Sequence, residues 1–179
     1  MHLFKKNRIP IFIFLLTASF TYAQSKDLVV IDSEYAEKGK VLALLPGSEV
    51  LELNSNSNPW EKIRVGLENN KNLNTVHLFV ESSYNAILMG GTSYSIETLN
   101  NEFELSMMEG LYSGTNYQLL IYSCNLASNE EGIELLNYIG QRAYMNVASG
   151  ADCSSVFDAG FAFNFQSLDS SLSPSIFQN

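Results

Sequence analysis

The sequence predicts a three-layer α/β domain, with a mostly parallel sheet and helices on both of its faces. Short apolar runs typical of buried strands begin near residues 28, 50, 75, 117 and 145, and segments with apolar residues at helical spacing lie between them. Strands separated by helices pair in parallel through right-handed crossovers. The functional crevice of such a sheet lies at the carboxyl ends of its strands.

The first half of the domain predicts two strand–helix units. The apolar run 28–31 ends at Asp32, as a buried strand does where it meets a turn. Residues 34–45 then predict a helix, because apolar side chains recur there at helical spacing, namely Tyr35, Leu42 and Leu45. The second unit is a strand at 50–53 and a helix from Pro59 to about residue 70, since proline suits the first position of a helix.

The second half predicts strands at 75–80, 117–123 and 145–149. A helix at 130–142 precedes the last of them, with inward positions expected at Ile133, Leu136 and Ile139. Between the first two strands, residues 86–94 predict a hairpin that turns at Gly90 and Gly91. A helix capped by Ser95 should follow, with an apolar stripe formed by Ile96, Leu99, Phe103 and Met107. Alternation over residues 161–165 predicts one further strand.

The first 23 residues have the order of a secretory signal peptide. Three basic residues precede an apolar run, and small residues then lead to Ala23, so cleavage is expected between Ala23 and Gln24. The alternative is a membrane anchor, but a spanning helix needs about 20 apolar residues and the run from 9 to 23 is shorter. We expect an exported protein, periplasmic, extracellular or at the cell surface, with no membrane span after cleavage.

The remaining chain predicts one domain, residues 27–166, and a flexible tail, residues 167–179. The full sequence has 10 basic and 19 acidic side chains and a formal charge of −9, and loss of the basic signal segment makes that charge more negative by three. An acidic chain repels phosphate backbones, which argues against nucleic acid as a partner. With 46% hydrophobic residues it is too apolar to be intrinsically disordered.

Cofactor and metal chemistry find little support in the sequence. His77 is the only histidine after signal cleavage, too few beside two cysteines for the usual zinc sets, and neither a phosphate-binding glycine loop nor a Gly-x-Ser-x-Gly motif occurs. We therefore expect no cofactor. Asp32, with Asp152 and Asp158, has two interpretations, a cation site in the crevice or solvated loop acids. Three tyrosines have two as well, a carbohydrate- or protein-binding surface or half-buried core positions: Tyr84, Tyr94 and Tyr112.

Four segments each contain an apolar strand: 29–33, 76–80 with Gly90 following, 120–127 and 147–149. The third is the most specific, because its strand ends in Tyr122-Ser123-Cys124-Asn125 and an apolar-alanine pair follows. Together these segments resemble a bacterial family catalogued as a domain of unknown function, number 4347. The resemblance implies a caspase-like α/β fold and, in typical members, a histidine–cysteine dyad, with Ser-His-Gly after the third strand and Gly-Cys after the fourth.

The chain departs from the implied dyad at the histidine. Cys124 stands at the nucleophile position, but Val80-Glu81-Ser82 replaces Ser-His-Gly, so Glu81 occupies the base position. His77 cannot substitute, because it lies four residues upstream in the same strand, about 13 Å from the crevice, and a general base must approach within about 3 Å. We expect His77 to be a hydrogen-bonded core residue. A carboxylate near Cys124 opposes thiolate formation and so raises the pKa of the thiol.

Cys124 has two other interpretations, a small buried hydrophobe or a disulfide with Cys153, which an exported protein permits. The chain as a whole leaves two function classes open. One is a catalytically degenerate, secreted, caspase-like domain that binds a protein or a surface glycan. The other is a cysteine endopeptidase in which Cys124 works with an unorthodox base. The lost histidine favours the first, a domain without caspase-like proteolysis.

Overall fold

The computed structural model describes residues 27–46, 48–70, 73, 75–112, 117–123, 126–151, 155–157 and 163–165. Several predictions fall outside these residues and stay predictions. They concern the signal peptide 1–23 with its cleavage between Ala23 and Gln24, the tail 167–179, and four site residues: Cys124, Cys153, Asp152 and Asp158.

The protein has an α/β fold built on a mostly parallel sheet, as predicted. The sheet has six strands in the order β2-β1-β3-β7-β8-β9. The first five are parallel and β9 runs antiparallel to β8. Their bounds are β1 Asp27–Asp32, β2 Val50–Leu53, β3 Thr75–Phe79, β7 Gln118–Tyr122, β8 Asn146–Gly150 and β9 Phe163–Phe165.

The central strands β3 and β7 are buried along their whole length because both of their faces are covered. The larger cluster of buried side chains lies on the face that carries the odd-numbered β7 residues Leu119 and Ile121. Four helices contribute to it: α2 Pro59–Asn69, α3 Ile96–Leu99, α4 Phe103–Met107 and α6 Glu130–Ala143. Trp60 of α2 is fully buried there and meets Tyr94 edge to face.

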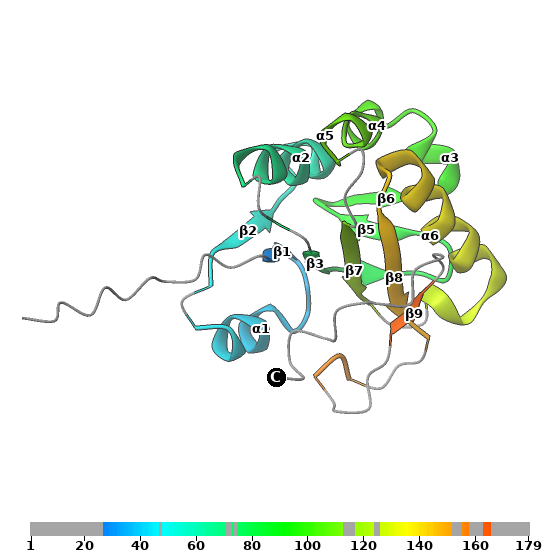
Figure 1. The fold of residues 1–179 in the computed structure, drawn as a ribbon. Helices are drawn as coiled ribbons and strands as arrows, with labels where there is room; N and C mark the ends of the chain where they lie inside the picture. Colours follow the sequence, from blue (N-terminus) through cyan, green and yellow to red (C-terminus); the bar gives the residue numbers. More distant parts are fainter. Residues whose placement is uncertain are drawn as a thin grey trace, which may run out of the picture.

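The opposite face is covered by α1, Lys38–Leu44, which Figure 1 shows on the other side of the sheet from α2. Val41 is its buried residue, whereas Leu42, one of the residues at helical spacing in the sequence, is 42% exposed. The cause is a turn after β1, in which the Tyr35 N–H donates to the Asp32 carbonyl. This turn delays the helix to residue 38, and the face that meets the sheet shifts by one residue.

A second, three-stranded sheet follows β3. Its strands are β4 Glu81–Ser82, β5 Ile87–Met89 and β6 Thr92–Tyr94, and adjacent strands are antiparallel. The predicted hairpin is therefore present, and positive φ angles of 57° and 74° explain the glycines at its turn, Gly90 and Gly91. The strand expected to run from 75 to 80 leaves the main sheet after Phe79, so Glu81 belongs to the hairpin sheet.

The long helix expected after Ser95 is divided into α3, α4 and α5 (Glu109–Tyr112). Glu102 interrupts it, because its carboxylate accepts a hydrogen bond from the Glu104 N–H and caps α4. The break changes the helical phase, and Phe103, expected in the apolar stripe, is 69% exposed. In the described ranges, no helix is both long and apolar enough to cross a membrane.

Candidate functional site

The candidate site is the carboxyl edge of the parallel sheet, where β1, β3 and β7 end side by side. The register aligns Ile31 with Phe79 and Phe79 with Tyr122. The residues that follow these positions are therefore neighbours in space, although about 45 residues separate each from the next in the chain. This edge brings together Asp32, Glu81, Ser82 and Ser123.

Glu81 lies at the predicted base position with its side chain exposed to solvent. Its Oε1 accepts a hydrogen bond of 3.2 Å from the Ala36 N–H, in the turn between β1 and α1. The carboxylate thus joins the hairpin sheet to the loop after β1. As an acceptor held by a backbone amide, it is placed to orient a loop.

Ser82 and Ser123 form a direct contact that the sequence analysis missed. The Ser123 hydroxyl donates to the Ser82 hydroxyl, and Ser123 is buried. The buried Ser149 of β8 donates to the Ile121 carbonyl at 2.9 Å, which ties β8 to the end of β7. Residue 123 thus contacts the residue after Glu81, whereas Cys124, the next residue in the chain, lies outside the described residues. The predicted proximity of Glu81 and Cys124 stays a prediction.

Asp32 is buried and has a structural role, because its carboxylate binds backbone N–H groups of two loops. Its Oδ2 accepts from the Gly90 N–H at 2.5 Å and its Oδ1 from the Glu34 N–H at 2.9 Å. It is therefore not a solvated loop acid, and its oxygens are committed to backbone donors. Within the described ranges, no group of three or more histidine, cysteine or acidic side chains could hold a metal ion.

Replacing Asp32 by alanine should lower the free energy of unfolding by about 2–4 kcal/mol, because two hydrogen bonds to a charged acceptor are lost and the Gly90 N–H stays buried. Asp32→Asn keeps one oxygen acceptor and should cost about half as much. Urea denaturation followed by circular dichroism measures both. Equal stability of the alanine variant and the wild type would contradict this role.

His77 lies inside β3 and not at the carboxyl edge. It is 2% exposed, its Nδ1 is 2.9 Å from the Tyr122 hydroxyl, and its Nε2 is 3.8 Å from Asp27 Oδ2. It pairs in register with Leu120, four positions before Cys124. The histidine is thus a hydrogen-bonded core residue. One ring nitrogen faces Asp27 at the start of β1 and the other faces Tyr122 at the end of β7.

The tyrosines differ in their surroundings. Tyr94 is buried against Trp60, and burial, followed by the charge of Glu102, raises the pKa of its phenol. The side chain of Tyr112 lies outside the described part. Tyr84 is 61% exposed and borders a groove of about 410 Å³ at the start of α6, lined otherwise by Asn129, Glu130, Glu131 and Glu134. An exposed aromatic surface therefore exists at Tyr84 and not at Tyr94.

Asn129 and Gly132 fix the start of α6 beside Tyr84. Asn129 caps α6 by accepting from the Gly132 N–H at 2.9 Å, and its Nδ2 donates to the Tyr84 carbonyl at 2.9 Å. A Cβ on Gly132 would collide with the Leu126 carbonyl oxygen and lie 2.9 Å from the Tyr84 carbonyl oxygen. Only glycine fits where α6 meets the loops after β4 and β7.

In a comparison with protein families, residues 28–156 match a model described as a domain of unknown function (DUF4347). No curated protein and no solved structure matches the chain. The matched range begins in β1 and ends at Val156, so it contains the carboxyl edge.

Proposed function

This chain belongs to the family described as domain of unknown function DUF4347, and we propose that it is an exported, catalytically degenerate domain of caspase-like fold that acts by binding. The proposal keeps Cys124 as a remnant of a nucleophile position and gives Glu81 no role as a base. Its ligand is a protein or a glycan of the cell surface.

The proposal depends on one observation, the environment of Glu81 at the position where the dyad requires a general base. The Glu81 carboxylate accepts from a backbone amide of the neighbouring loop, and an anion at that position opposes formation of a thiolate beside it. The other candidate base, His77, is buried in mid-strand and hydrogen-bonded to Tyr122. A general base must lie within hydrogen-bond reach of the proton that it removes. His77 pairs in register with Leu120, four residues before Cys124, so it lies too deep in the sheet to serve the position after β7. Glu81 would bring a negative charge to that position.

The alternative is a working cysteine endopeptidase in which Cys124 is activated by another group. The exposed surface at Tyr84 and the nearby groove would then receive a substrate segment. The two functions differ in one property, the reactivity of the Cys124 thiol at neutral pH, because only a thiolate attacks rapidly.

The deciding experiment alkylates the mature protein with iodoacetamide at pH 7 after mild reduction and locates the label by mass spectrometry. We expect Cys124 to react no faster than an unperturbed thiol, and a mixed peptide library to stay uncleaved. The Cys153→Ser variant isolates the signal of Cys124, and a mass measurement without reduction reports any bridge between the two. Rapid labelling of Cys124, with peptide cleavage that Cys124→Ala abolishes, would overturn the proposal in favour of the peptidase.

A further inference from the structure

The outer edge of the main sheet is formed by β2, which among the described residues pairs with β1 alone. The Leu53 carbonyl accepts from the Ser33 N–H at 2.8 Å, so the backbone groups of Leu53 face β1. Because successive residues of a strand direct these groups to opposite sides, those of Val50 and Glu52 face outward. The Lys62 amine donates to the Glu52 carbonyl at 3.2 Å from the neighbouring helix α2. The edge thus offers strand-pairing groups, one of which a lysine covers.

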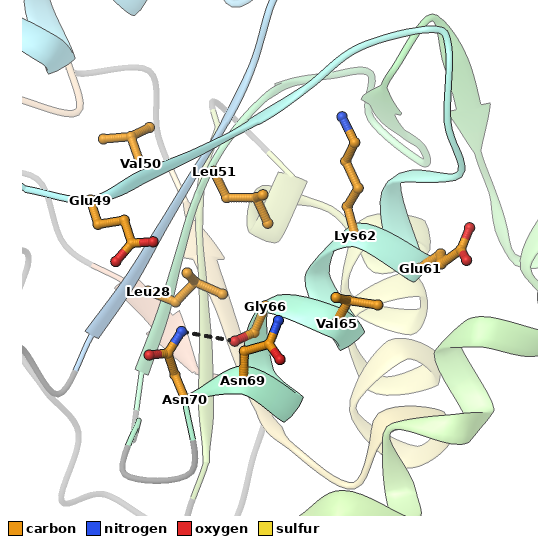
Figure 2. Close-up of a pocket in the computed structure, with 10 residues that line it drawn as sticks. All are labelled: Leu28, Glu49, Val50, Leu51, Glu61, Lys62, Val65, Gly66, Asn69 and Asn70. Atoms are coloured by element: carbon orange, nitrogen blue, oxygen red, sulfur yellow. Dashed lines mark hydrogen bonds between the residues drawn. The ribbon is translucent and has the colours of Figure 1, made fainter.

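A groove of about 420 Å³ runs beside this edge, between β2 and α2 (Figure 2). Leu28, Leu51 and Val65 give it an apolar lining, and Val65 is 39% exposed. The helix approaches the sheet closely at Gly66, where a Cβ would lie 3.2 Å from a Leu28 methyl carbon. The volume of the groove leaves room for side chains of an additional strand placed along β2.

The charges around the groove favour a basic occupant over a second copy of the chain. Glu49 and Glu61 line the groove, and the cation among its lining residues, Lys62, already donates to a carbonyl. The chain carries a formal charge of −9, so two copies repel each other when they pair edge to edge. A segment with apolar and basic side chains would meet both the lining and the acids.

We propose that β2 and this groove, the β2 edge site, bind an extended segment of a partner protein in which apolar and basic residues alternate. The segment joins the sheet as a strand beside β2, with its backbone bonded to Val50 and Glu52 and its apolar side chains in the groove. The Lys62 amine would give up its hydrogen bond to the Glu52 carbonyl, which then accepts from the backbone of the incoming strand. This inference rests on the proposed function, since it names a binding site of a domain that acts by binding.

The probe is a short fluorescein-labelled peptide in which lysine and valine alternate, titrated with the mature protein in fluorescence anisotropy. We expect saturable binding. A peptide of the same sequence, N-methylated at every second residue, lacks the N–H donors of one edge and should bind at least about fivefold more weakly. A peptide with glutamate in place of lysine should bind more weakly still, because it meets the acidic rim.

A matched pair of variants tests the edge itself. Glu52→Pro removes an outward N–H and is compatible with an edge strand, whereas Glu52→Thr removes the same carboxylate and keeps the N–H. The proline variant should bind about fivefold more weakly than the threonine variant. Lys62→Met, which frees the Glu52 carbonyl, should strengthen binding severalfold.

A second change guards against misfolding of the proline variant. Val65→Lys alters an exposed residue of the groove and should weaken binding by at least about fivefold, whereas Leu44→Lys, on the exposed side of α1, should leave it unchanged. Circular dichroism confirms that each variant is folded.

Three outcomes would each overturn the β2 edge site. They are the absence of saturable binding, equal affinities for the Glu52→Pro and Glu52→Thr variants together with an unaffected Val65→Lys variant, and a dimer in sedimentation that excludes the peptide. Peptide cleavage that depends on Cys124 would instead refute the proposed non-catalytic function. The affinities of the Glu52 and Val65 variants would still test the β2 edge site.

Discussion

Replacing Gly132 by alanine is expected to lower the free energy of unfolding by about 3 kcal/mol or more. The added Cβ would collide with the Leu126 carbonyl oxygen and approach the Tyr84 carbonyl oxygen to 2.9 Å, and both are backbone atoms that cannot rotate away. Helix α6 would have to move away from the loops that it contacts. Urea denaturation of the variant and the wild type measures the difference.

Gly39 provides the matched control, because it lies in α1 and nothing within 4 Å would meet an added Cβ there. Gly39→Ala should raise stability by about 0.5–1 kcal/mol, since alanine loses less backbone freedom than glycine in a helix. The same chemical change thus has opposite signs at two helical positions. If Gly132→Ala were neutral, α6 would not be packed as tightly on these loops as the structure has it.

The sequence predicted the parallel sheet because its strands are buried on both faces. Such strands read as continuous apolar runs, and β3 and β7 are buried at every position. Helix phase was harder to predict. Val41 faces the sheet and Leu42 does not, because the turn through Tyr35 sets where α1 starts. The apolar periodicity of one short helix does not record that offset.

The candidate site could be predicted as an edge but not as a set of contacts. The apolar runs that end at Asp32, Val80 and Ser123 identify the carboxyl ends of neighbouring strands. The bond from Gly90 to Asp32 joins residues 58 positions apart, and its existence depends on where the hairpin packs. The contact between Ser82 and Ser123 likewise follows from the chain leaving the main sheet after Phe79. No local pattern in the sequence specifies either.

Replacing Glu81 by histidine is expected to lower the pKa of the Cys124 thiol by about one unit or more. The reason is the predicted proximity of the two residues, which would place an imidazolium instead of a carboxylate beside the thiolate. The residues flanking the pair already meet, since Ser82 follows Glu81, Ser123 precedes Cys124, and their hydroxyls are hydrogen-bonded. The measurement is the rate of alkylation of Cys124 against pH. Cys153→Ser is included in every protein compared, so that Cys124 stays reduced.

Glu81→Gln separates charge removal from the gain of a base. Glutamine keeps an oxygen that can accept from the Ala36 N–H, so the loop contact survives while the negative charge is lost. The thiol pKa should therefore fall in the order wild type, Glu81→Gln, Glu81→His. Peptide hydrolysis need not appear, because a lowered thiol pKa supplies a nucleophile but no substrate pocket. Superimposed alkylation curves for all three proteins would show that residues 81 and 124 are not neighbours, and the interpretation of Glu81 as the replacement of a dyad histidine would then be wrong.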